Sequence, residues 1–246
     1  MSKVAVILEL RKHKALSFVL NNVLNVLPTE WNIQILHGNQ NKQYLDNLIN
    51  KDPLLNESKS RIILTNILID YITPEETSSI ILTEDYWNRI IGDTILIFQC
   101  DTILCENSKY KISDFEHFDY IGGYWGIKLP PLYSKYNWVM NGGLSLRKKQ
   151  YMLDIIKYKL KDYILNGGNP CEDYFVSNCN LYLPTVKDVL SFSIDNGYQA
   201  PYDNDLPFGF HKPWGGNPSK GHGRAYNIIK ELYPKVEILK KLQENV

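Results

Sequence analysis

Ile95–Cys105 reads I-L-I-F-Q-C-D-T-I-L-C, an apolar run that is interrupted by polar residues at its centre. Thr94–Phe98 is a nearly continuous apolar run, as expected of a strand that is covered on both faces in an α/β sheet. The polarity then changes abruptly at Gln99 and Asp101. Ligands of open α/β sheets bind beyond the carboxyl ends of the strands, so Asp101 is a candidate to hold a divalent cation against a diphosphate. An Asp can also end a strand by bonding to its own backbone, and this stretch alone favours neither interpretation.

Strands and helices alternate through the first half of the chain. Strands are predicted at Val4–Leu8, Trp31–Leu36 and Arg61–Leu68, and helices at Ala15–Leu27, Gln40–Asn50, Pro74–Ile81 and Glu84–Ile91. This alternation predicts right-handed βαβ units and a central, mostly parallel sheet flanked by helices.

The second half of the chain follows a less regular pattern. We expect a strand at Phe118–Trp125, a loop over the site at Tyr124–Asn137, a strand at Leu144–Leu146 followed by a helix, a short helix opened by Glu172-Asp173, a late strand at Leu190–Ile194, a Gly/Pro-rich loop at Pro207–Arg224, and a terminal helix at Ala225–Gln243 interrupted by Pro234. We see no internal repeat, linker or low-complexity block, so one domain over residues 1–246 is predicted.

Composition indicates an ordinary globular protein and excludes several classes. Hydrophobic residues make up 44% and charged residues 22% of the 246 residues. Lys+Arg 27 against Asp+Glu 27 gives no net charge, so no general attraction to nucleic acid is expected. None of the four cysteines forms a C-x-x-C pair, which argues against a zinc ribbon. With no signal peptide or membrane span evident, a cytoplasmic protein with four free thiols is predicted.

Five polar motifs occur in a fixed order along the chain. They are Q-x-D at Gln99–Asp101, D-Y-I-G-x-x-W at Asp119–Trp125, N-G-G-L-S-L-R at Asn141–Arg147, E-D at Glu172–Asp173, and G-F-H at Gly209–His211. With this ordered set, the chain resembles the GT-A-fold, metal-dependent glycosyltransferases from about Val4 to Trp214. It most closely resembles a little-characterised family of glycosyltransferase-like proteins.

The resemblance implies a Rossmann-like GT-A domain that transfers a sugar from a nucleotide-diphosphate sugar to a hydroxyl of a glycan or glycoprotein. The first half, about residues 1–125, would bind the nucleotide sugar. The second half, about residues 126–246, would bind the acceptor and carry the catalytic residues. The acidic pair implies an inverting reaction with a carboxylate base.

The resemblance also assigns a metal site to Asp101 and His211. Asp101 corresponds to the second carboxylate of a D-x-D element, which binds Mn²⁺ or Mg²⁺ at the donor diphosphate. Gln99 replaces the first carboxylate, which lowers the negative charge offered to the metal. His211 corresponds to a distant histidine that completes such sites, and an imidazole favours Mn²⁺ over Mg²⁺. The alternative for His211 is a loop histidine bonded to backbone, and His222 is a weaker candidate ligand.

The remaining assignments each have a simpler structural alternative. Asn141, Gly142 and Gly143 resemble a segment that lines the donor sugar, although Asn-Gly also favours a tight turn. Asp173 is the expected base and Glu172 the acceptor-orienting carboxylate, although acids also stabilise a helix amino terminus.

Four further residues are candidates for binding the substrates. Glu9 and Arg11 follow the first strand, where they could bind the nucleotide or form an exposed ion pair. Trp125 and Trp214 could stack on acceptor sugars or pack in the core. Fold resemblance does not settle function, so a carbohydrate- or nucleotide-binding protein without catalysis and a nucleotidyltransferase stay open as alternatives.

Overall fold

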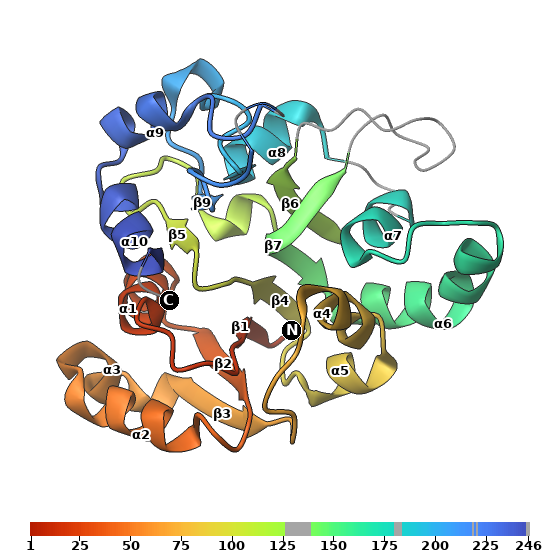
Figure 1. Cartoon of the computed structure of the whole chain (residues 1–246), viewed down its shortest axis with the longest axis horizontal. Helices are drawn as coiled ribbons and strands as arrows, with labels where there is room; N and C mark the ends of the chain where they lie inside the picture. Colours follow the sequence, from red (N-terminus) through yellow and green to blue (C-terminus); the bar gives the residue numbers. More distant parts are fainter. Residues whose placement is uncertain (126–138, 180–183, 218, 220, 245–246) are drawn as a thin grey trace.

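Within the described residues, a nine-stranded sheet forms the centre of the molecule, with helices along both of its sides (Figure 1). The computed structural model describes residues 1–125, 139–179, 184–217, 219 and 221–244. The strand order is β3-β2-β1-β4-β7-β6-β8-β9-β5, so the first four strands of the chain occupy one side of the sheet and the later strands the other.

The first half forms the parallel part of the sheet. Its elements are β1 (Lys3–Leu8), α1 (Leu16–Val26), β2 (Trp31–His37), α2 (Lys42–Lys51), α3 (Pro53–Glu57), β3 (Ile62–Asn66), α4 (Pro74–Ile81), α5 (Glu84–Arg89) and β4 (Thr94–Ile97). β1 pairs in parallel with both β2 and β4, and β2 pairs in parallel with β3. Val4 to Ile7 of β1 are fully buried, as the continuous apolar run predicts.

The second half adds a mixed part. Its elements are β5 (Thr102–Leu104), β6 (Tyr120–Tyr124), β7 (Met140–Lys148), α6 (Lys149–Leu165), α7 (Glu172–Cys179), α8 (Val186–Phe192), β8 (Ser193–Asp195), β9 (Gly209–His211), α9 (Tyr226–Leu232) and α10 (Lys235–Gln243). β7 lies antiparallel between β4 and β6. β8 pairs in parallel with β6 and β9, and β5 closes the sheet antiparallel to β9. The predicted α/β class with a central sheet and flanking helices is confirmed.

Two predicted segments differ from the structure. The strand expected at Leu190–Ile194 is wrong over its first half, because Thr185 and Asp188 form a capping box that starts α8, and the strand begins only at Ser193. The loop expected at Pro207–Arg224 contains the strand β9. Glycine is disfavoured in strands, but β9, which begins with Gly209, pairs with β5 and β8. Most of the expected loop at Tyr124–Asn137 lies outside the described residues.

Two other expectations, for the terminal helix and for the cysteines, agree with the structure. The terminal helix is divided at Pro234 into α9 and α10, and α10 ends where Gln243 donates a hydrogen bond to the carbonyl of Cys100. All four cysteines are free. In the part of the chain that the structure describes, we find no helix with the length and apolar character needed to span a membrane.

Candidate functional site

A cavity of about 820 Å³ opens beyond the carboxyl ends of β1 and β4. Both halves of the chain contribute to its wall. The lining includes Glu9, Arg11, Gln99, Asp101, Asn141, Gly142, Gly143, Glu172, Asp173, His211, Lys212 and Trp214. In a parallel sheet this edge is the usual place for a ligand. The fold therefore brings most of the residues singled out in the sequence to one cavity.

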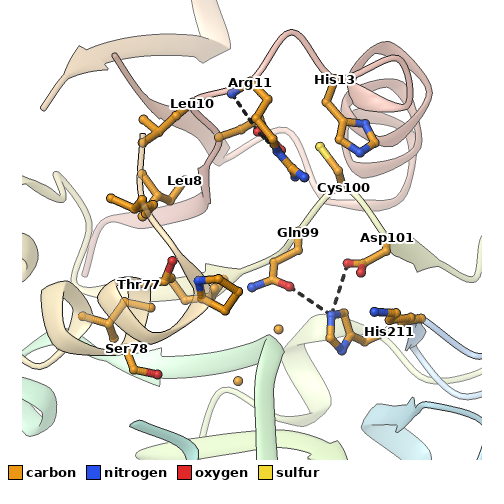
Figure 2. Close-up of a pocket in the computed structure, with 18 of the residues that line it drawn as sticks. Leu8, Leu10, Arg11, His13, Thr77, Ser78, Gln99, Cys100, Asp101 and His211 are labelled. Atoms are coloured by element: carbon orange, nitrogen blue, oxygen red, sulfur yellow. Dashed lines mark hydrogen bonds and ion pairs between the residues drawn. The ribbon is translucent and has the colours of Figure 1, made fainter. Parts of the chain in front are cut away.

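Asp101, Gln99 and His211 meet at one point of the cavity wall (Figure 2). Nε2 of His211 lies 3.2 Å from Oδ1 of Asp101 and 3.1 Å from Oε1 of Gln99. Asp101 and Gln99 follow β4, whereas His211 ends β9, so the sheet brings His211 to residues 110 and 112 positions earlier in the chain. The backbone is tied as well, since the N–H of Lys212 donates to the carbonyl of Asp101 at 2.9 Å.

Charge pairing shifts the pKa values of both Asp101 and His211. Burial disfavours the ionised carboxylate of Asp101, but the adjacent His211 outweighs that effect and the pKa is held at about 2. Burial also disfavours the imidazolium of His211, but Asp101 and Asp195 raise its pKa to about 10. Without a metal the pair is therefore an aspartate and an imidazolium at neutral pH.

The same donor set fits a divalent cation. Oδ1 of Asp101 is buried and accepts no hydrogen bond of good geometry. Nε2 of His211 lies beside this oxygen, and the amide oxygen of Gln99 lies beside Nε2. The three residues together offer one carboxylate, one imidazole and one neutral oxygen. Such a mixed set suits Mn²⁺ when water and phosphate oxygens complete the shell. Among the described residues, no group of three His, Cys, Asp or Glu side chains is placed to hold a metal, so Gln99 would have to contribute.

Asn141, Gly142 and Gly143 lie inside β7 rather than in a turn between elements. Gly122 pairs with Ser145 and Gly123 with Asn141, so β7 bulges between these pairs. Oδ1 of Asn141 accepts the N–H of Gly143 at 2.7 Å, which stabilises the bulge. The strand passes so close to the site that a Cβ at Gly143 would overlap the His211 ring. At Gly142, a Cβ would lie 2.7 Å from Glu172 and 2.8 Å from Asp173.

The acidic pair opens α7, as the sequence predicts, and both side chains are buried at the cavity wall. Oδ1 of Asp173 accepts the N–H of Gly142 at 2.7 Å, and its Oδ2 lies 3.3 Å from the amide of Asn141. Glu172 forms an ion pair with Arg147 of β7. Burial raises the pKa of Asp173 well above its usual value, and the neighbouring Glu172 raises it further.

Arg147 supports this pair from beneath the cavity. Its side chain is almost completely buried, and its guanidinium lies 5.7 Å from the ring centre of Trp87 and 5.2 Å from that of Tyr120. Its Nε donates to Oγ of Ser145 at 2.9 Å, and Ser145 donates in turn to the carbonyl of Gly142. The arginine thus connects Glu172 to the strand that binds Asp173.

The remaining candidates differ in their position. Glu9 is buried and its carboxylate receives three bonds from Arg11, one from the N–H and two from the guanidinium, so most of its hydrogen-bonding capacity is used within the chain. Trp214 lines the cavity. Trp125 instead packs edge-on against Tyr174 at 5.8 Å and is not part of the cavity lining. His222 bonds to Tyr198 and is not part of the cavity lining.

Sequence reasoning missed Asp195, Arg147 and Lys212. Asp195 bonds to Nδ1 of His211 at 2.5 Å, and only the pairing of β8 with β9 brings the two residues together. Lys212 lines the cavity directly after His211 and has a left-handed backbone, with φ 44°. Arg147 is the last residue of the N-G-G-L-S-L-R motif. Its charge at the end of a predicted strand was the one local sign in the sequence that it could have a role in the site.

Three solved structures resemble this chain over nearly its whole length. The galactosyltransferase LgtC, solved with donor and acceptor sugar analogues, is 12% identical, with 99% of this chain and 96% of that chain covered and a TM-score of 0.58. GlyE of Streptococcus pneumoniae TIGR4, described as a glycosyltransferase, is 14% identical, with 99% and 63% covered and a TM-score of 0.53. WbbM, described as a bifunctional glycosyltransferase, is 10% identical, with 98% and 51% covered and a TM-score of 0.53.

These likenesses show that the chain has the GT-A fold, in agreement with the prediction from the sequence. The chain spans only about half of WbbM. No curated protein sequence matches it. A family model described as "Protein of unknown function (DUF5672)" matches residues 64–211, a range that includes the Q-x-D, N-G-G, E-D and G-F-H motifs. The chain therefore belongs to the DUF5672 family of proteins of unknown function.

Proposed function

We propose that this chain is a glycosyltransferase that moves a sugar from a nucleotide-diphosphate sugar to a hydroxyl of an acceptor. The observation that carries the proposal is that Asp101, His211 and Asp173 line one cavity at the carboxyl edge of a GT-A sheet. Asp101 and His211 could hold a cation at the leaving diphosphate and Asp173 could act as a base at the acceptor hydroxyl, which supports this proposal.

Asp101 and His211, with Gln99, would hold Mn²⁺ or Mg²⁺. When bound, that ion would neutralise charge on the diphosphate leaving group. Lys212 is exposed at the cavity wall beside Asp101, where its ammonium would add positive charge near the same phosphates. Trp214 lines the cavity and offers a ring on which a sugar can stack.

Asp173 is assigned as the base in this proposal. Its carboxylate takes the proton of the acceptor hydroxyl while the acceptor oxygen forms a bond to the anomeric carbon of the donor. The bond between that carbon and the phosphate oxygen breaks, and the nucleoside diphosphate leaves with the electron pair. Attack on the face opposite the leaving group inverts the anomeric carbon. Glu172, whose Oε1 is paired with Arg147, orients the acceptor through its other oxygen.

The test is a binding screen of nucleoside diphosphates and nucleotide sugars with and without Mn²⁺, measured by thermal shift and then by calorimetry. We expect at least one donor to bind, and its affinity to fall at least tenfold with EDTA and with Asp101→Ala. Asp46→Ala serves as the control, because Asp46 pairs with Lys42 on the surface of α2 and is not part of the cavity lining. Equal affinity under all these conditions would remove the metal from the proposal, and no binding by any donor would contradict the function.

A further inference from the structure

Asp195 is a completely buried carboxylate behind the cavity wall. Its exposed fraction is 0%, and it is not one of the residues that line the cavity. Its Oδ1 lies 2.5 Å from Nδ1 of His211. Burying a carboxylate costs free energy unless the group is paired and hydrogen-bonded. The contact with His211 offsets this cost for Asp195.

The backbone around Asp195 fixes that contact. Asp195 and His211 are direct partners in the parallel register of β8 and β9. The next residue, Asn196, has a left-handed backbone with φ 49°, and its N–H donates to the carbonyl of His211 at 3.1 Å. Its side-chain amide donates to Oδ2 of Asp195 at 2.6 Å. Both carboxylate oxygens are therefore held, and the carboxylate has little freedom to turn away from the ring.

The opposite edge of the His211 ring faces the cavity. Its Nε2 lies 3.2 Å from the buried Oδ1 of Asp101, an oxygen that accepts no hydrogen bond of good geometry. The backbone of Gly143 packs against the ring so closely that a Cβ there would overlap it. Asp195 also accepts the side-chain amide of Asn196, and with Asp195 as the acceptor of the contact with His211, Nδ1 of His211 carries the proton. The lone pair for a metal then belongs on Nε2, the nitrogen that faces the cavity.

We propose that Asp195 is a positioning residue that holds His211 as an Nε2 metal ligand, fixing both its ring orientation and its tautomer. The inference rests on the proposed metal site at Asp101 and His211. Carboxylate partners of ligating histidines raise the basicity of the ligand, and their loss weakens metal binding by about 10–100-fold.

The experiment measures Mn²⁺ affinity by calorimetry, first with Mn²⁺ alone and then with Mn²⁺ and inorganic pyrophosphate, so that no donor sugar has to be known. Wild type is compared with Asp195→Asn. Asp205→Asn makes the same change in net charge at the exposed Lys109–Asp205 pair and serves as the control. We expect about 10–100-fold weaker binding for Asp195→Asn and unchanged binding for the control. Equal affinity in all three proteins would overturn the inference and leave the proposed function standing. Absence of Mn²⁺ binding by the wild type would overturn the metal site and, with it, the inference.

A second measurement needs only the wild-type protein and covers the case in which Asp195→Asn does not fold. Long-range ¹H–¹⁵N correlation spectra of the histidine rings, recorded with diamagnetic Zn²⁺ and pyrophosphate, report which nitrogen of His211 carries a proton. We expect a proton on Nδ1 and none on Nε2. The opposite tautomer would overturn the inference.

Discussion

Among the single residues of the site, Arg147 determines how the two acidic side chains, Glu172 and Asp173, are held. Burying an ion pair costs desolvation that its attraction rarely exceeds, so the Arg147–Glu172 pair is a weak source of stability. Its geometric effect is clearer, because it fixes Glu172 beside Asp173 and connects both to the backbone of Gly142. Asp173 is thereby held in an environment that disfavours its charge. Strongly perturbed carboxylates in cavities are typical of catalytic groups.

We expect Asp173→Asn to keep the fold and donor binding while sugar transfer falls by about two to four orders of magnitude, the usual effect of losing a positioned base. Burial makes the ionised Asp173 unfavourable, so its replacement by a neutral amide should leave the melting temperature unchanged or raise it. Steady-state transfer, donor affinity and thermal unfolding check these outcomes. Wild-type transfer by Asp173→Asn would contradict the assignment, and loss confined to Glu172→Gln would exchange the two roles.

The pH dependence of transfer gives a separate prediction for Asp173. A base must be ionised, and its raised pKa means that it loses its proton only well above the range of an ordinary aspartate. Transfer should therefore decline on the acid side at a pH clearly above 4, and this limb should disappear from the residual activity of Asp173→Asn. A limb at the ordinary carboxylate pKa would contradict the environment that we describe.

At the scale of elements, β7 organises the site. It pairs with β4 and β6, its bulge binds Asp173, and its glycines allow close approach to His211 and the acidic pair. The sequence signals for this strand are ambiguous, because Asn-Gly also favours a turn. The bulge arises from pairing with β6, which no local pattern records. The helix at Glu172 could be predicted, since acidic residues open it directly.

The bulge leads to a prediction for Gly143. In Gly143→Ala the new Cβ would overlap the imidazole of His211, so the ring or the strand must shift from the position that places Nε2 beside Asp101. We expect Mn²⁺ affinity, measured by calorimetry with pyrophosphate, to fall at least tenfold. Gly167→Ala is the control, because its Cβ meets nothing within 4 Å while its φ of 79° still costs stability. If both variants bind Mn²⁺ as the wild type does, close packing at Gly143 is not needed for the metal site.

At the scale of the whole molecule, local sequence patterns predict the first half best. Continuous apolar runs identify β1 and β4, and helical spacing identifies α1. In these elements the apolar residues of the pattern are the ones that are buried in the core. The short strands β8 and β9 escape such reasoning, since three residues carry almost no periodicity and their pairing partners are distant in the chain. Asp195 was missed for this reason, whereas Asp101 and Asp173 could be proposed from motifs. Their catalytic and metal roles stay predictions.

The stability of the metal-free protein should depend on pH through His211. The carboxylates of Asp101 and Asp195 raise the pKa of His211 from the unfolded value of 6.5 to about 10. A raised pKa means that the contribution of the imidazolium to folding is complete below pH 6.5 and is lost as the pH rises to about 10. The free energy of unfolding should therefore be higher for wild type than for His211→Gln at pH 6. The difference should shrink toward pH 10, with a slope of at most about 1.4 kcal/mol per pH unit for one proton.

Urea unfolding of both proteins in EDTA, from pH 5 to pH 10, measures this difference directly. Subtracting the His211→Gln curve removes the opposing effect of groups such as Asp173 that both proteins share. Mn²⁺ should act in the reverse direction, because it competes with the proton for Nε2 and binds more tightly as the pH rises. A difference between the two proteins that stays constant from pH 6.5 to pH 10 would show that His211 is not held as an imidazolium between Asp101 and Asp195.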